Sequence, residues 1–271
     1  MPVRSALMTV MVRAADKAAR GLKRDFGEVE NLQVSKKGPA DFVSTADLKA
    51  ERVLKEELSK ARPDYAFLME ESGATGVSGS EGRRWVVDPL DGTTNFLHGL
   101  PHFAISIALE EKGEIIAALI YDPIKEEQFH AEKGGGAFLN DRRLRVSGRT
   151  RMEDALIGTG IPFKGHGEHG TFAAEVERVS AEVAGVRRWG AATLDLAYVA
   201  AGRLDGFWER GLSPWDIAAG ALLVREAGGY FSTLDGKPWT LDGDAVLAAN
   251  SYLHQPLASL VLGRKVATKA G

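Results

Sequence analysis

Two aspartates, Asp88 and Asp91, stand three residues apart at the end of an apolar run, in the stretch VVDPLDGTTNF (residues 86–96). Two carboxylates this close repel each other, so the pair needs a proton or a compensating positive charge. Pro89 fixes the backbone between the acids, and Gly92 allows the chain to turn sharply behind them. Taken alone, DPLDG is also compatible with a plain turn, because Asp, Pro and Gly are common turn residues.

The residues that follow the pair favour phosphate chemistry. Thr93, Thr94 and Asn95 supply hydroxyls and backbone N–H groups where a helix can begin, and such a position suits an anion. Acids beside an anion site make sense if hard cations lie between them, because Mg²⁺ binds carboxylates together with substrate phosphate. Two metal ions on paired carboxylates can hold both the attacking and the leaving oxygen of a displacement at phosphorus. The pattern therefore indicates metal-assisted phosphoryl transfer.

Further acids stand at the ends of expected elements. Glu70 and Glu71 close an apolar run, Asp216 follows Trp215 at the start of a helical pattern, and Asp47 lies in the first turn of another. An acid near a helix N-terminus is often a cap or a partner of the helix dipole. The Glu70–Glu71 pair alone is typical of a solvated loop start. From the residues alone, structural and metal-binding roles both remain open for these acids.

Composition sets the limits of these interpretations. The chain has 271 residues, 44% of them hydrophobic and 26% charged, which predicts one large domain or two intimately packed halves. Its net charge of −3 provides no overall basic field for nucleic acid or anionic lipid. The absence of cysteine excludes disulfides, thiolate metal sites and cysteine nucleophiles, and fits a reducing cytoplasm. No stretch approaches the roughly 20 apolar residues of a membrane span, so we expect an unexported cytoplasmic protein.

The elements that must position these residues fall into two halves. Residues 1–150 begin with an amphipathic helix and a second helix with an apolar stripe, followed by hairpin patterns such as FAISIALEEKGEIIAALIYDP (103–123). Residues 151–271 alternate short strands with helices, including the segment 215–229, which Gly228-Gly229 closes. The expected apolar positions are Leu7, Met11, Ala14, Ala18 and Leu22 in the first helix, and Leu48, Leu54 and Leu58 in the second.

Two long segments resemble the signatures of a known family. WVVDPLDGTTNF (85–96) resembles D-P-x-D-G-T-x-N-F of the inositol monophosphatase family, and WDIAAGALLVREAGG (215–229) resembles its W-D-x-A-A-G-x-x-x-x-x-E-A-G-G signature. The supporting segments DFVSTAD, EES and RRWGAATLDLAYVAAGRLDGFWE stand in family order. The resemblance implies one domain over 1–271 with an α+β or α/β fold, a layered α/β/α/β/α sandwich of the inositol monophosphatase and fructose-1,6-bisphosphatase type. Members are usually homodimers and are often inhibited by lithium.

The resemblance also implies a set of metal and catalytic residues. Glu70, Asp88 and the carbonyl of Leu90 would hold a first Mg²⁺, which carries the attacking water. Asp88, Asp91 and Asp216 would hold a second ion beside the leaving oxygen, and Glu70 would help to hold a third, weaker ion through water. Thr93, partnered with Asp47, would orient or deprotonate the nucleophile.

The substrate side is implied in the same way. Gly92 and Thr93 would offer backbone N–H groups to the phosphate. Lys36, in the loop VSKKGPADF, matches a mobile-loop lysine that approaches the metal and phosphate site. Glu209 would accept sugar or inositol hydroxyls, and the residues facing the alcohol half of the substrate would be Asp91, Gly190, Ala191, Ala192 and Glu209.

The expected activity is Mg²⁺-dependent hydrolysis of a small polyol phosphate, first of all myo-inositol 1-phosphate. The alternatives within the superfamily are fructose-1,6-bisphosphatase, 3′-phosphoadenosine 5′-phosphate phosphatase and histidinol-phosphate phosphatase. An adenine nucleotide needs extra pocket for its base, and no insertion supplies it. A further alternative is regulatory, because some bacterial members contact RNA polymerase; direct nucleic-acid binding is not expected.

Overall fold

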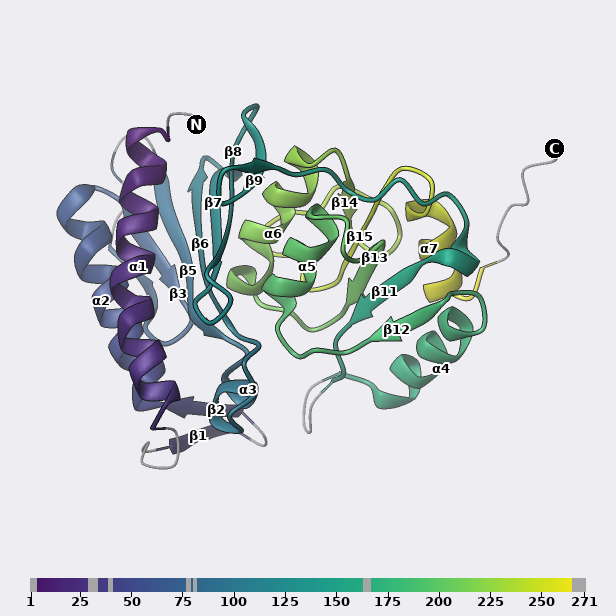
Figure 1. Cartoon of the computed structure of the whole chain (residues 1–271), viewed down its shortest axis with the longest axis horizontal. Coiled ribbons are helices and arrows are strands. Elements are labelled where there is room, and N and C mark those ends of the chain that lie inside the picture. The colour runs from purple at the N-terminus through teal and green to yellow at the C-terminus, as the bar shows by residue number, and fades with distance from the viewer. Residues whose placement is uncertain are drawn as a thin grey trace.

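The chain folds into five layers of helices and sheets. The computed structural model describes residues 4–28, 34–38, 41–76, 79, 82–162 and 167–264, with the backbone alone for 34–38 and 41–43. In Figure 1 the layers follow one another from left to right: α1 and α2, an eight-stranded sheet, α5 and α6, a five-stranded sheet, and α4 with α7. Each layer is apolar on the side that meets its neighbour, as a stacked architecture requires. The layered sandwich predicted from the sequence is confirmed.

The first layer is formed by α1 (Ala6–Phe26) and α2 (Thr45–Ala61). The predicted apolar face of α1 is buried at Met11, Ala14, Ala18 and Leu22. Ser5 begins this helix, and its hydroxyl accepts a hydrogen bond from the backbone N–H of Met8.

The predicted stripe of α2 is wrong at Leu48, which is 49% exposed, whereas Leu54 and Leu58 are fully buried. Positions on one helix face are three or four residues apart, and Leu48 lies six residues before Leu54. The buried face instead continues backwards through Glu51 and Asp47. The first turn of α2 therefore carries a buried acid, Asp47, on the face that packs against the rest of the protein.

The eight-stranded sheet has the order β10-β9-β8-β7-β6-β5-β3-β4. Only β3 and β5 pair in parallel, and the other neighbours are antiparallel, as the predicted hairpins require. The strands are β3 (Ala66–Met69), β4 (Gly73–Thr75), β5 (Arg83–Asp91), β6 (Ala104–Glu111), β7 (Glu114–Asp122), β8 (Glu127–Glu132), β9 (Gly136–Leu139) and β10 (Arg142–Arg143).

Strand β5 carries a bulge at its end. Asp88 pairs with Ser106 and Asp91 with Ala104, so three steps along β5 match two steps along β6. Side chains alternate between the two faces of a strand, so residues three apart in a regular strand point to opposite faces. The extra residue brings Asp88 and Asp91 to the same face.

Helices α5 (Ala192–Ala200) and α6 (Pro214–Glu226) form the middle layer and bury apolar side chains against both sheets. They pack closely at Gly220, where a Cβ atom would lie 2.4 Å from Cδ1 of Leu196. A helix that is apolar on all sides, as α6 is from Ile217 to Val224, belongs inside a protein. The middle layer therefore fixes the two sheets relative to each other.

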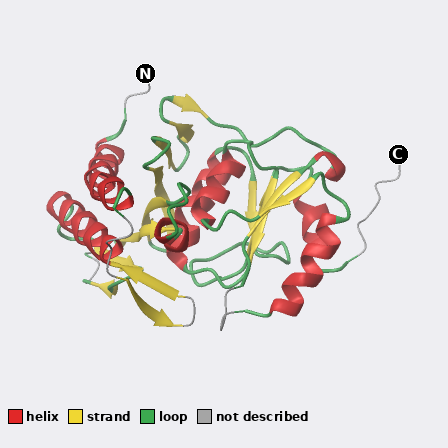
Figure 2. Cartoon of the chain, turned by 60° about the horizontal axis from the view of Figure 1, so that its bottom comes forward, coloured by secondary structure: helices red, strands yellow, loops and turns green. Residues whose placement is uncertain are grey.

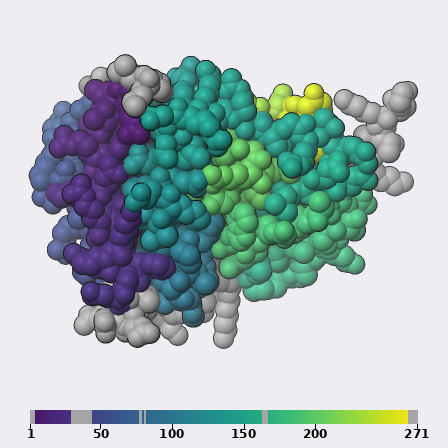
Figure 3. All heavy atoms as spheres, viewed as in Figure 1, coloured from purple at the N-terminus to yellow at the C-terminus, as the bar shows by residue number. Residues whose placement is uncertain are grey.

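The five-stranded sheet has the order β12-β11-β13-β15-β14, and α4 (His169–Ser180) and α7 (His254–Val261) cover its outer face. Figure 2 shows the sheet between α4 and the middle helices, and Figure 3 shows that the N-terminal and C-terminal parts of the chain form one continuous surface on this face. No helix among the described residues is long and apolar enough to cross a membrane. The remaining elements are β1 (Val34–Gly38), β2 (Asp41–Ser44), α3 (Thr93–Leu97), η2 (Met152–Asp154), β11 (Leu156–Thr159), β12 (Gly185–Arg187), β13 (Gly206–Glu209), β14 (Tyr230–Ser232) and β15 (Val246–Ala249).

Candidate active site

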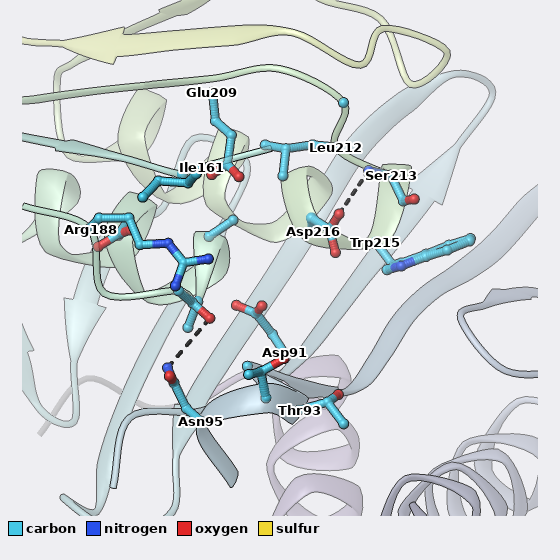
Figure 4. Close-up of a pocket in the computed structure, with 18 of the residues that line it drawn as sticks. Asp91, Thr93, Asn95, Ile161, Arg188, Glu209, Leu212, Ser213, Trp215 and Asp216 are labelled. Carbon is cyan, nitrogen blue, oxygen red and sulfur yellow. Dashed lines mark hydrogen bonds between the residues drawn. The ribbon is translucent and has the colours of Figure 1, made fainter. Parts of the chain in front are cut away.

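A cavity of about 440 Å³ lies between the two sheets, where β5, β11 and β13 end and α3, α5 and α6 begin. Acidic side chains line it from both sides, as Figure 4 shows for Asp91, Asp216 and Glu209. The predicted residues that line this cavity are Glu70, Asp91, Gly92, Thr93, Gly190, Ala191, Ala192, Glu209 and Asp216. Residues more than 100 positions apart in the sequence therefore meet at one site.

The bulged end of β5 provides the first acids. Asp88 is 2% exposed, and its Oδ1 accepts a hydrogen bond from the backbone N–H of Leu90 at 2.8 Å. Asp91 reaches across to α5, where its Oδ2 accepts hydrogen bonds from the backbone N–H and the hydroxyl of Thr193, the former at 2.8 Å. Asp91 thus links the first sheet to the start of α5 and is held in position by it.

The start of α6 provides the acid on the opposite side. Ser213 caps this helix, Pro214 follows at its first turn, and Asp216 Oδ2 accepts a hydrogen bond from the backbone N–H of Ser213 at 2.7 Å. In Figure 4 the carboxyl group of Asp216 points into the cavity toward Asp91. The motif around Trp215 and Asp216 is therefore both a helix cap and one wall of the site.

These acids raise the pKa values of one another. Burial, followed by the charges of Glu70, Asp91 and Asp216, raises the pKa of Asp88 well above its usual value. Burial raises the pKa of Asp91 to about 6. Burial and then the charge of Asp91 raise the pKa of Asp216 to about 8. No ion pair of the described residues neutralises Asp88, Asp91 or Asp216, so the cluster attracts protons or cations from outside the chain.

The donor set suits a hard cation, although it is not a finished cage. Among the described residues, no three Asp, Glu or His side chains are already arranged as metal ligands. The converging groups are nevertheless all oxygen donors, the kind that Mg²⁺ and Ca²⁺ prefer. A divalent cation would remove the repulsion that raises the pKa values of these carboxyls.

Thr93 and Asp47 form the hydrogen-bonded pair that the resemblance implied. The Thr93 hydroxyl lies 3.0 Å from Asp47 Oδ1 and 3.0 Å from the carbonyl oxygen of Leu90, so it can donate to either. Asp47 is fully buried, and its Oδ2 accepts hydrogen bonds from the backbone N–H and the hydroxyl of Ser44. Burial raises the pKa of Asp47, although the Ser44 and Thr93 hydrogen bonds oppose this effect. The buried acid of α2 therefore meets the end of β5.

The opposite wall of the cavity combines the predicted Glu209 with two residues that the sequence did not identify, Asp195 and Arg188. Glu209, at the end of β13, lies beside Asp195 of α5, and Arg188 projects into the cavity below Glu209 in Figure 4. Burial, followed by the charges of Asp195 and Asp91, raises the pKa of Glu209 to about 8, whereas Arg188 lowers it. Burial also raises the pKa of Asp195 well above its usual value.

The sequence contained only weak signals for these residues. Asp195 lies in a segment with a helical pattern, where a lone acid gives no signal of function. Asn95 was noted only as part of an anion site, but its side-chain amide donates to the carbonyls of His102, at 2.8 Å, and Trp189, at 2.7 Å. It thereby joins the loop after α3 to the wall formed by residues 188–192.

Two predicted ligands and one predicted lysine differ from the rest. Asp88 and Leu90 lie under the cavity rather than on its lining, and the Leu90 side chain is fully buried, with its carbonyl oxygen facing Thr93. The side chain of Lys36 lies outside the described part of the chain, so its role stays a prediction.

Comparison with known proteins agrees with this geometry. Residues 3–264 match the Inositol monophosphatase family. The chain belongs to this family. It is a phosphatase, of a family known for metal-dependent members, so the resemblance and the enzyme class predicted from the sequence are confirmed.

Individual relatives support the assignment along almost the whole chain. The chain is 61% identical over 258 residues to the inositol-1-monophosphatase of Mesorhizobium japonicum, covering 95% of this chain and 97% of the relative. It is 45% identical over 259 residues to the Nus factor SuhB of Pseudomonas aeruginosa, covering 94% and 95%. It superimposes with a TM-score of 0.92 and 56% identity on the extragenic suppressor protein suhB of Bartonella henselae, covering 95% and 98%.

Proposed function

We propose that this family member hydrolyses myo-inositol 1-phosphate, or a similar small polyol phosphate, to the alcohol and inorganic phosphate with Mg²⁺. The observation that carries the proposal is a single cavity with two chemically different walls. One wall presents Asp91 and Asp216 above the buried Asp88, and the other presents Glu209 to an alcohol. The name of the Mesorhizobium relative supports the same substrate.

The acids of the first wall would hold the metal ions. Glu70, Asp88 and the Leu90 carbonyl are the proposed ligands of one Mg²⁺, and Asp88, Asp91 and Asp216 those of a second, with a third near Glu70. When bound, magnesium supplies positive charge that makes a water more acidic and stabilises charge on the phosphate oxygens. The mutual repulsion of these carboxyls favours ions over an empty site.

Thr93 and Asp47 would prepare the attacking water. When the Thr93 hydroxyl donates to Asp47 Oδ1, its lone pairs are oriented to accept a hydrogen bond from the water. Ser44 holds the other oxygen of Asp47, so the carboxyl stays in place and can take up a proton through Thr93. We assign the orientation of the nucleophile to this pair and its deprotonation to the pair together with Glu70.

Gly92 and Thr93 would receive the phosphate on their backbone N–H groups. Gly92 has a φ of 88° and initiates α3, and a Cβ atom there would lie 3.0 Å from the His102 carbonyl oxygen. Glycine therefore lets the backbone turn and pack closely against residues 102 and 103. Beyond it, the small residues Gly190, Ala191 and Ala192 leave room for a compact alcohol.

Phosphate release from a substrate panel tests this proposal. The panel contains inositol 1-phosphate, fructose 1,6-bisphosphate, 3′-phosphoadenosine 5′-phosphate, histidinol phosphate and glycerol 2-phosphate, each with Mg²⁺ and with EDTA. The highest kcat/KM for inositol 1-phosphate, lost in EDTA, is expected. A different preferred substrate would contradict the assignment of the alcohol wall, and turnover in EDTA would contradict the metal site. Lithium added to the same assay is expected to inhibit.

We infer a second, regulatory role as an additional candidate, because the chain is also similar to a relative named Nus factor SuhB. This role consists of contact with RNA polymerase and does not require catalysis. Capture of polymerase subunits by an Asp88→Asn variant separates the two activities. If neither the wild type nor this inactive variant captures polymerase subunits, the regulatory role is excluded.

We further propose that the protein acts as a homodimer in the cytoplasm and that its two halves unfold as one unit. Light scattering behind a sizing column measures the mass directly, and a value near 29.1 kDa would show a monomer instead. A single calorimetric unfolding transition is expected for one cooperative unit.

A further inference from the structure

Asp195 is a buried acid whose surroundings do not explain its presence. It stands in the first turn of α5, is 1% exposed and lines the cavity. Its Oδ1 has no hydrogen-bond partner among the described residues. Buried polar atoms in folded proteins are almost always hydrogen-bonded, so an orphaned oxygen at the wall of a ligand cavity is explained by a donor on the ligand.

The strand that faces Asp195 and Glu209 lacks side chains where these acids lie. At Gly160 a Cβ atom would be 1.7 Å from Oε1 of Glu209, so no other residue fits without moving this acid. At Gly158 a Cβ atom would lie 2.8 Å from Cδ1 of Leu204 and in van der Waals contact with Cγ of Asp195, at 3.7 Å. Thr159, between them, turns its hydroxyl away to the carbonyl of Trp208, at 2.8 Å. The end of β11 thus forms a bare surface on which both carboxyl groups rest.

A polyol matches the polar groups on this wall. Asp195 and Glu209 present carboxyl oxygens, and the guanidinium of Arg188 lies on the same side of the cavity in Figure 4. A hydroxyl group can donate one hydrogen bond and accept others, so neighbouring hydroxyls of a polyol can satisfy acids and a guanidinium together. An alkyl or aryl group would leave these groups unpaired, which is costly in a closed site.

We propose that Asp195 is a specificity-determining residue that accepts a hydrogen bond from a hydroxyl of the alcohol half of the substrate, beside Glu209. This assignment rests on the proposed hydrolysis of polyol phosphates. It selects cyclic or linear polyol phosphates over phosphate esters without hydroxyls. Asp195 acts on Glu209 and is not among the proposed metal ligands, so it contributes to choice of substrate rather than to the phosphoryl step.

A purely structural role makes a different prediction. An acid in the first turn of a helix can stabilise that helix through its dipole. Removing such an acid would lower stability and would reduce turnover of all substrates by the same factor. Asp205, which is 2% exposed and accepts hydrogen bonds from the Leu156 N–H and Arg149, is the matched structural control outside the cavity.

The experiment compares Asp195→Ala, Asp195→Asn and Asp205→Asn with the wild type on inositol 1-phosphate and phenyl phosphate. For Asp195→Ala we expect kcat/KM for inositol 1-phosphate to fall about ten- to a hundredfold, mainly through KM, as for a lost hydrogen bond to a charged group. Turnover of phenyl phosphate should change less than about threefold. Asp195→Asn keeps an acceptor oxygen, so it should recover most of the loss in kcat/KM for inositol 1-phosphate. Asp205→Asn should change kcat/KM for both substrates by the same factor.

The outcomes separate this inference from the proposed function. Equal losses on both substrates in Asp195→Ala would overturn the inference while leaving polyol phosphate hydrolysis in place. A wild type that prefers phenyl phosphate would overturn both. If the alanine variant does not fold, monodeoxy inositol 1-phosphates decide with Asp195→Leu, which keeps the branched shape of the side chain without an acceptor: the wild type should reject one of them, and the variant should reject it less. Identical discrimination by the two proteins would overturn the inference.

Discussion

Asp88 and Asp205 are both 2% exposed, yet their carboxyl groups have opposite kinds of neighbours. Asp205 accepts hydrogen bonds from the Leu156 N–H at 2.7 Å and from the guanidinium of Arg149 at 3.1 Å. Asp88 accepts one backbone N–H and faces other acids. Glu175 and Asp216 differ in the same way. Glu175, behind the second sheet, accepts hydrogen bonds from Trp208 and Arg210, whereas Asp216 lies among the acids of the cavity.

This difference distinguishes structural acids from functional ones. A buried acid with a cationic partner is balanced inside the folded chain, and its removal leaves the partner without a counter-charge. A buried cluster of acids without such partners destabilises the fold until protons or cations arrive. Acids that are unbalanced by the chain itself therefore indicate where an external partner belongs, either a cation or a hydrogen-bond donor of a ligand.

Removing divalent cations should have the largest effect. Phosphate release in EDTA is expected to stop, and the melting temperature should fall more at pH 8.5 than at pH 6. Asp216 has a pKa of about 8 when folded against a usual 3.8, so the folded chain keeps a proton that the unfolded chain has lost. The contribution of Asp216 to folding stability without metal is therefore fully present below about pH 4 and is lost as the pH rises through 8.

Calorimetry of the metal-free and Mg²⁺-loaded protein across this pH range checks the effect. The stabilisation by Mg²⁺ should grow with pH, because ionised carboxyls bind it better. Asp216→Asn should flatten the pH dependence of the metal-free protein. A melting temperature that rises with pH in EDTA would show that these acids are balanced after all.

Asp88→Asn should have the next largest effect. The expected kcat falls at least about a hundredfold, because one ligand shared by two ions is lost. The metal-free variant should melt at a higher temperature than the metal-free wild type, because one repelling charge has been removed. Steady-state kinetics and thermal unfolding test both parts, and a less stable variant with normal turnover would reverse the classification of Asp88.

Thr93→Ala should affect chemistry more than metal affinity. Without the hydroxyl, Asp47 loses its 3.0 Å link to the site, and kcat is expected to fall about a hundredfold. Thr93→Ser keeps the hydroxyl and should retain most of the activity. Titration calorimetry with Mg²⁺ should give similar affinities for all three proteins. A large loss of Mg²⁺ affinity in the alanine variant would move Thr93 into the metal site.

Asp205→Asn should have the smallest effect on activity and a clear effect on stability. Loss of the charge that balances Arg149 is expected to reduce the free energy of unfolding by about 2 kcal/mol. The melting temperature should fall by several degrees while kcat/KM stays near that of the wild type. A variant that is inactive at a temperature where it is folded would contradict the separation of the two kinds of acid.

The sequence predicted the elements better than the neighbours of individual side chains. The helix α1 and the hairpin of β6 and β7 follow from periods of 3.6 and two residues, which are local properties. The error at Leu48 arose because three leucines were grouped by residue type rather than by angle. Asp47 and Thr93 were paired through resemblance alone, since no local signal connects α2 with the end of β5 46 residues later.

The resemblance implied Glu209 and residues 190–192 in the alcohol wall, whereas Asp195 and the role of Gly160 could not be predicted, for a different reason. Asp195, Glu209 and Gly160 lie on three elements whose meeting depends on the packing of the whole second sheet. No period or turn signal in one segment shows that its side chain will lack a partner. The division at residue 150 and the role of Lys36 stay predictions.

The bulge in β5 makes the site sensitive to chain length in a way that substitution does not reveal. Because the bulge accommodates one extra residue, deleting Leu90 would restore an ordinary strand in which the two acids, now two residues apart, still share a face. The deletion would instead remove the carbonyl oxygen that lies 3.0 Å from the Thr93 hydroxyl and that we propose as a metal ligand. A deletion of a single codon here would thus remove a backbone ligand that no side-chain substitution can reach, while leaving the architecture recognisable.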